Sequence, residues 1–103
     1  MLILGSGNVA HNLQLARFGD DVQPFDWAAR FQADVRARIE SDDDDSLVSY
    51  RDLGDDARLA VPTPDHYYPL LYVLGARHPD DVARFPIEGI DAASLSMLSV
   101  VLG

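Results

Sequence analysis

Residues 1–13 read MLILGSGNVAHNL, and this stretch decides the fold that the sequence predicts. The apolar run Met1–Leu4 stops at the small residues of Gly5–Asn8, a pattern typical of a buried strand that leads into a tight loop. Apolar residues then recur at spacings of four and three over Val9–Phe18, which indicates a short helix. We therefore expect a chain that begins inside a sheet.

The remainder of the chain predicts further helices and two closing strands. A longer amphipathic helix is expected from about Pro24 to Glu40, because large apolar residues recur there every four positions. Shorter helices are expected over Ser46–Tyr50 and Leu70–Leu74, the second ended by Gly75, with Ala57–Val61 as an apolar link between them. The expected strands are Arg84–Ile90 and Leu95–Leu102.

These elements predict an α/β fold with a partial sheet and flanking helices. Met1–Leu4 is apolar on both faces, so as a strand it needs neighbours on both sides. Only the two closing strands are available for that, and the sheet is expected to be incomplete. We therefore expect the chain to expose an apolar edge or face that is covered by self-association or by another polypeptide.

Composition excludes several classes of protein. The 103 residues include 8 Lys and Arg against 17 Asp and Glu, a net charge of −9 that argues against a nucleic-acid partner. The absence of cysteine excludes disulfides and thiolate metal sites, which leaves His, Asp and Glu as ligands. No apolar run approaches the roughly 18 residues that cross a bilayer, so no membrane partner is expected. The first residues also lack the pattern of a signal peptide, so the expected location is cytoplasmic rather than secreted.

The glycine loop also resembles a nucleotide-binding motif. Gly5–Ala10 matches the pattern G-x-G-x-x-G/A between an expected strand and an expected helix. The motif also requires a second parallel strand that ends in an acid, and Val22–Asp26 offers only a fragment interrupted by proline. A noncatalytic nucleotide-binding module built on Gly5-Ser6-Gly7 is therefore kept as the alternative function.

Two histidines are the candidate chemical groups. His11 and His66 each lie near an expected helix start, where the helix dipole favours a neutral imidazole that can bind a metal or act as a base. Both also follow loops from apolar segments, the edge at which α/β sheets bind ligands. A structural, hydrogen-bonded role is the alternative for either one. His78 lies beside Asp80 and Asp81 and is expected to be exposed.

Three blocks of sequence carry a resemblance to a known family. They are Gly5–Leu13, Val61–Leu71 and Ser94–Met97. In this order and spacing they are similar to the signature blocks of the carboxy-terminal half of the DOPA 4,5-dioxygenase-like class III extradiol ring-cleavage family. The resemblance implies that residues 1–103 are the carboxy-terminal portion of a single dioxygenase domain. The amino-terminal half, which in that family supplies two more metal-binding histidines, has no counterpart in these residues.

The resemblance implies a ring-cleaving oxidoreductase that uses Fe(II) or Zn(II), a catechol-type substrate and O2. His11 and His66 correspond to family histidines at the metal and are assigned here both as metal ligands and as catalytic groups; which of them is the ligand and which the acid/base stays open. Asn8 and Asp65 are candidates to orient an imidazole through its other nitrogen. The chain on its own is expected to be inactive, because a catalytic iron of this type needs at least three protein ligands.

Overall fold

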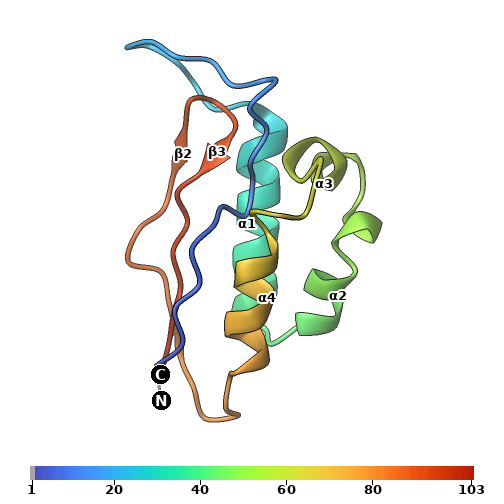
Figure 1. Cartoon of the computed structure of the whole chain (residues 1–103), viewed down its shortest axis with the longest axis vertical. Helices are drawn as coiled ribbons and strands as arrows, with labels where there is room; N and C mark the ends of the chain where they lie inside the picture. Colours follow the sequence, from blue (N-terminus) through green and yellow to red (C-terminus); the bar gives the residue numbers. More distant parts are fainter. Residues whose placement is uncertain (1) are drawn as a thin grey trace.

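Helices and short antiparallel strands make up the fold of residues 2–103, which a computed structural model describes (Figure 1). This arrangement confirms the expected α/β class. The helical elements are α1 (Asp26–Glu40), α2 (Asp44–Val48), the 3-10 helix η1 (Tyr50–Leu53), α3 (Asp55–Ala60) and α4 (Tyr68–Gly75). The strands are β1 (Ala83–Arg84), β2 (Ile90–Asp91), β3 (Leu95–Ser96) and β4 (Val101–Leu102).

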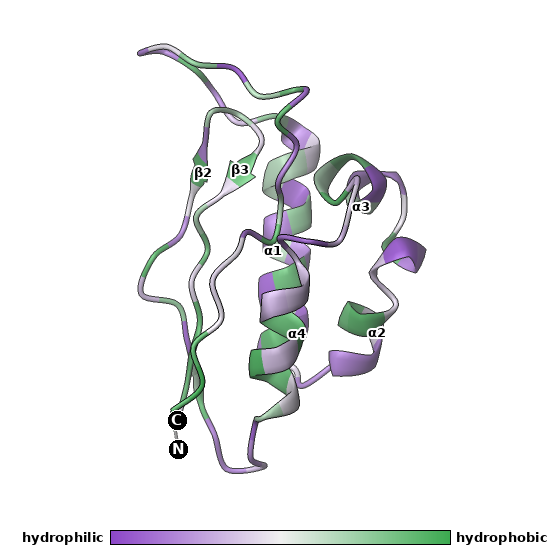
Figure 2. Ribbon diagram, viewed as in Figure 1, coloured by the Kyte–Doolittle hydropathy of each residue, from purple (hydrophilic) through white to green (hydrophobic). Residues whose placement is uncertain are grey.

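Helix α1 supplies the centre of the core. Its buried face consists of Ala28, Phe31, Val35 and Ile39, which recur at the spacing expected from the sequence. The opposite positions carry ion pairs within and beyond the helix, such as the one between Arg38 and Asp34. Figure 2 shows this alternation of hydrophilic and hydrophobic residues along α1. The helix begins two residues later than expected, because Phe25 is its N-cap residue and Pro24 precedes it.

The acidic run Asp42–Asp45 starts the next helix. The side chain of Asp43 accepts a hydrogen bond from the backbone N–H of Ser46 and so caps α2. The helix therefore covers Asp44–Val48 rather than the expected Ser46–Tyr50. The expected link at Ala57–Val61 is largely helical, because Ala57 and Ala60 are both buried on the inner side of α3. A six-residue helix with only two buried alanines carries too weak a periodic signal to be predicted.

The two closing segments pair with each other as antiparallel strands. Strand β1 pairs with β4, and β2 pairs with β3. Hydrogen bonds from Met97 to Gly89 and from Ser99 to Ile87 continue the pairing between them. The register shifts by one residue between the two strand pairs, at a position next to Pro86. The result is a long, irregular hairpin that lies against α1.

The turn between β2 and β3 has an unusual backbone. Ala92 and Ala93 both adopt positive φ angles, of 49° and 66°, although neither is glycine. Both alanines are buried, and their carbonyl oxygens accept hydrogen bonds from the N–H groups of Arg17 and Phe25. The turn thereby holds the long loop that precedes α1.

The amino-terminal expectations are wrong for the residues that the structure describes. Leu2–Leu4 form no strand, and Leu2 and Leu4 are 81% and 85% exposed; Met1 lies outside the described residues. An apolar run becomes a buried strand only where neighbouring strands pair with it, and within residues 2–103 no strand pairs with this one. No helix forms over Val9–Phe18 either, where the chain instead makes an isolated antiparallel bridge between His11 and Leu95. None of the helices in residues 2–103 has the length and apolar character to cross a membrane.

Candidate functional site

Three segments far apart in sequence meet at one place. The backbone N–H of Asn8 donates to the carbonyl of His66 at 2.8 Å, and the N–H of Ser96 donates to the carbonyl of Ala10 at 2.9 Å. The N–H of His11 donates to Ala60 at 2.8 Å. These backbone bonds hold the segment around Asn8–His11 between the start of α4 and strand β3.

The imidazole rings of His11 and His66 stack on each other at this junction. Their centroids are 3.6 Å apart and their planes differ by 18°. The two candidate histidines from the sequence are thus brought together, although their chemical roles stay predictions. His78, the third histidine, is exposed and lies beyond α4. Its backbone N–H donates a hydrogen bond to the carboxylate of Asp81.

The surroundings favour the neutral form of His11. Burial, followed by the nearby His66, lowers the pKa of His11 below its ordinary value of 6.5. His11 is half-buried, whereas His66 is exposed and lies two residues before α4. The expected cause for His11 was wrong, because it lies in a β-bridge rather than at a helix start. Desolvation, not a helix dipole, is the main cause of its lowered pKa.

Two glycines allow the amino-terminal segment to lie close to α4. A Cβ atom at Gly7 would overlap the carbonyl oxygen of His66, and one at Gly5 would lie 2.8 Å from the carbonyl oxygen of Pro69. The loop Gly5-Ser6-Gly7 therefore packs against the segment that carries His66, and no helix follows it directly. This is not the strand-loop-helix context that a dinucleotide motif requires.

The remaining candidates lie near the histidines in different ways. The side-chain amide of Asn8 donates to the carbonyl of Ser96 at 2.7 Å, so Asn8 reaches His66 through its backbone N–H rather than its side chain. Asp65 is exposed, and within residues 2–103 no hydrogen bond joins its carboxylate to either imidazole. Their expected role in orienting an imidazole stays a prediction.

The two tyrosines after His66 have separate environments. Tyr67 is buried, and its ring packs against Tyr50 at a centroid distance of 4.7 Å. Burial, followed by the neighbouring Tyr50, raises the pKa of Tyr67 far above its ordinary value. Tyr68 is exposed. Tyr67 therefore belongs to the core and fixes the segment that carries His66.

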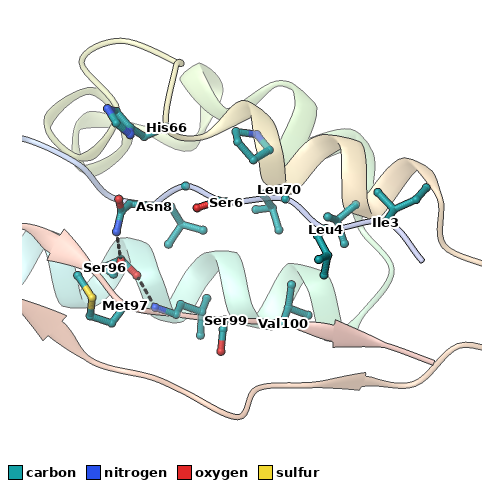
Figure 3. A pocket seen from close by; sticks show the side chains of 16 residues that line it. Ile3, Leu4, Ser6, Asn8, His66, Leu70, Ser96, Met97, Ser99 and Val100 are labelled. Carbon is teal, nitrogen blue, oxygen red and sulfur yellow. Dashed lines mark hydrogen bonds between the residues drawn. The ribbon is translucent and has the colours of Figure 1, made fainter. Parts of the chain in front are cut away.

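A cavity of about 320 Å³ opens beside His66 (Figure 3). His66 and Asn8 lie at one end of it, whereas the other end is apolar and includes Leu4 and Val100. Ser96 also lines this cavity. The sequence did not single it out as a functional residue. Its hydroxyl makes a 2.6 Å hydrogen bond with Gln32 of α1 and accepts one from the N–H of Leu98. A buried serine in a short strand gives no signal in the sequence beyond the family resemblance.

Within the described part of the chain, no three His, Asp or Glu side chains gather closely enough to hold a metal ion. The stacked pair His11 and His66 is thus the largest cluster of metal-binding groups at this junction. A complete site for a catalytic metal needs at least one further protein ligand.

Known proteins resemble the chain along its whole length. It is 42% identical over 106 residues to the 4,5-DOPA dioxygenase extradiol of Escherichia coli (strain K12), a match that covers 100% of this chain and 39% of that protein. The chain is a homologue of the extradiol DOPA dioxygenases. The protein of the same name from Beta vulgaris is 31% identical over 97 residues, which cover 93% of this chain and 35% of that relative. No family model matches the chain.

A solved structure supports the same homology. The crystal structure of a protein from Escherichia coli K12 described as uncharacterized superposes with a TM-score of 0.83 and 44% identity, over 92% of this chain and 40% of that one. The chain therefore spans about two fifths of the length of the extradiol dioxygenases and of the structure that it matches. This share agrees with the expected resemblance to only one portion of the longer family members.

Proposed function

We propose that this chain supplies two imidazoles, His11 and His66, to a site that cleaves the ring of a catechol-type substrate with O2 and a non-haem Fe(II) or Zn(II). The observation that carries the proposal is the stacking of the two rings at 3.6 Å. The two rings come from different segments of a chain that is 42% identical to an extradiol dioxygenase. This juxtaposition has no use in packing the core, because His66 is exposed.

The stacked geometry suits one metal ligand and one acid/base group. An imidazole nitrogen binds a metal through a lone pair that lies in the plane of the ring. The two rings are nearly parallel and their centroids are 3.6 Å apart, so one ion cannot lie in the planes of both rings at once. We therefore assign the ligand to His11, the more buried of the two rings, because burial disfavours the protonated form, which cannot bind a metal.

His66 is then the group that handles protons. It is exposed and lines the 320 Å³ cavity, so it is accessible to a bound catechol. A neutral imidazole has one ring nitrogen that accepts a proton and one that donates, so His66 is suited to take a proton from a catechol hydroxyl and to return it later in the reaction. A metal ion held by His11 would supply the positive charge that lowers the pKa of the catechol hydroxyls, and a position for O2.

In this proposal, the remaining metal ligands come from outside residues 1–103. A catalytic iron of this type needs at least three protein ligands with open positions for substrate and O2, and residues 2–103 bring no third ligand to the pair. The longer relatives carry about three fifths of their length outside the match. We propose that this region completes the site and that the 103-residue chain alone does not turn over.

Metal titration of purified variants tests the assignment. Isothermal titration with Zn(II) is expected to show weak binding to the wild-type chain and about a tenfold loss in His11→Gln, because each ligand contributes on the order of 1.4 kcal/mol or more. His66→Gln should keep most of the metal affinity but lose catechol binding. His78→Gln is the matched control and should behave as wild type.

Two outcomes would contradict the proposal. Equal Zn(II) affinity in wild type and His11→Gln would remove His11 from the metal site. Binding of NAD by the wild-type chain, with no binding of metal, would favour the alternative of a noncatalytic nucleotide-binding module.

A further inference from the structure

Helix α3 ends beside His11 with carbonyl groups that need hydrogen-bond donors. The last four carbonyls of an α-helix have no N–H partner within the helix itself. The carbonyl of Ala60, the last residue of α3, accepts the backbone N–H of His11 at 2.8 Å. The carbonyl of Leu59 accepts the side-chain amide of Asn12 at 2.7 Å. Two consecutive residues, one of them a candidate site residue, thus complete the end of this helix.

Asn12 is bonded in two further directions. Its side-chain oxygen accepts the N–H of Leu15 at 3.2 Å, within the turn over residues 13–15. Its backbone carbonyl accepts the hydroxyl of Ser94, the residue before β3, at 2.7 Å. Asn12 is 7% exposed and Ser94 is fully buried, so an unpaired polar group would be costly at either position. Asn12 therefore joins α3, the following turn and the start of β3.

These bonds fix the backbone from which the His11 ring projects. His11 is held by Ala60 on one side and by its bridge to Leu95 on the other, and Asn12 anchors the next residue along the chain. With this backbone fixed, the ring can move only about its two side-chain torsion angles. Because the centroids of the two imidazoles are 3.6 Å apart, a small displacement of the backbone would separate the rings.

We infer that Asn12 is a positioning residue for the ring-cleaving site, and that it holds the backbone at His11 so that the two imidazoles meet. Ser94 supports it through the Asn12 carbonyl. The inference rests on the proposed function for the reaction that His11 serves. The geometry that it concerns, however, is that of the two rings and does not depend on a bound metal.

A purely stabilising asparagine would behave differently. Loss of such a residue would lower the stability of the fold and leave the two rings stacked. Loss of a positioning residue separates the rings in a chain that is still folded. The stacking of the rings, rather than stability alone, is therefore the quantity to measure.

Asn12→Leu tests the inference, because it keeps the approximate size of the side chain and removes both of its hydrogen bonds. NMR spectra of the full 103-residue chain without metal report the stack through NOEs between the His11 and His66 rings. Hydrogen exchange of the His11 amide reports the bond to Ala60. We expect the NOEs to disappear in Asn12→Leu and the exchange to quicken by about tenfold or more.

Val35→Ala is the matched control. Val35 is fully buried on α1, so this variant leaves a cavity in the core and lowers stability without removing any hydrogen bond of Asn12. It should keep the NOEs between the two rings.

Ser94→Ala decides the question if Asn12→Leu does not fold, which circular dichroism would show. It removes one hydroxyl and leaves the Asn12 side chain in place. We expect weaker NOEs between the rings and faster exchange of the His11 amide than in wild type.

Two results would overturn the inference. One is that the rings stay stacked in folded Asn12→Leu or, if that variant does not fold, in Ser94→Ala. The other is that Val35→Ala loses the NOEs as well, since any loss of stability would then disturb the rings. A wild-type chain that binds no Zn(II) would contradict the proposed function instead, and the measurements on the rings would still decide the role of Asn12.

Discussion

The hydroxyl of Tyr67 donates a 2.7 Å hydrogen bond to the backbone carbonyl of Leu47, in the middle of the core. Tyr67 directly follows His66, so this bond ties the exposed histidine to helix α2. The ring of Tyr67 also packs between Tyr50 and Phe31. The backbone at His66 is thus anchored by a buried neighbour, while its own ring stacks on His11.

Removal of this hydroxyl should destabilise the fold. Tyr67→Phe keeps the ring but leaves the Leu47 carbonyl without its partner, which costs about 1–3 kcal/mol for a buried acceptor. Urea unfolding should show a lower midpoint with an unchanged slope. Tyr72→Phe, at an exposed position of α4, is the control and should match wild type. Equal midpoints for the two variants would show that the Leu47 carbonyl finds another donor.

The close approach at Gly7 predicts a sensitive position. Gly7→Ala places a methyl group where the His66 carbonyl lies, so the hydrogen bond from Asn8 to that carbonyl must break or shift. We expect lower stability and a changed chemical shift for the His66 ring in NMR spectra. Gly75→Ala is the control, because a Cβ there meets nothing within 4 Å. An unchanged His66 resonance in Gly7→Ala would contradict the described packing.

The lowered pKa of His11 predicts how stability depends on pH. The unfolded chain takes up a proton on this ring near pH 6.5, whereas the folded chain does so only at lower pH. The contribution of His11 to stability is therefore complete above pH 6.5 and is lost as the pH falls from there through the folded pKa. Urea midpoints should decrease across this window in wild type and in His78→Gln, and should decrease less in His11→Gln. The same slope in all three proteins would show that His11 is not desolvated.

The core of α1 should be far more sensitive to truncation than the loop before it. Phe31 is 2% exposed and Phe18 is 78% exposed. Phe31→Ala should cost about 3–5 kcal/mol, a large part of the stability of a small domain. Phe18→Ala should change stability by no more than about 0.5 kcal/mol. Circular dichroism during thermal unfolding measures both, and a mild effect of Phe31→Ala would mean that the core rearranges.

Helices α1 and α4 were predictable because each carries its own signal. The four buried residues of α1 recur at helical spacing, and α4 begins with Pro69 in its first turn and ends at Gly75. The hairpin strands were predictable as apolar segments. The positions at which their pairing is interrupted were not predictable. The one-residue shift of register near Pro86 depends on how the two segments pair.

The amino-terminal segment shows where such reasoning fails. An apolar run predicts a buried strand, but burial depends on what covers the run, and Leu2–Leu4 are exposed in this chain. The helix expected after the glycine loop is likewise replaced by a bridge between His11 and Leu95. Tertiary pairing with β3 outweighs the weak helical spacing of Val9–Phe18.

The candidate site was predictable in its parts but not in its geometry. The sequence singles out His11 and His66 because imidazoles bind metals and transfer protons. The family resemblance assigns both of them to one site. Their stacking depends on Gly5 and Gly7, which let two backbone segments approach each other. The Asn8 side chain donates to the carbonyl of Ser96 on β3 rather than to an imidazole, which its place in the motif did not predict.

The two left-handed alanines of the β2–β3 turn make this hairpin an obvious point for protein engineering. A left-handed backbone costs an alanine about 1–2 kcal/mol that glycine does not pay, and here Ala92 and Ala93 are also buried, so a larger residue would not fit. Glycine at either position would relax the backbone while preserving the carbonyls that hold Arg17 and Phe25. A chain made more heat-resistant in this way, without any change near the histidines, would be a sturdier background in which to substitute the residues of the histidine junction.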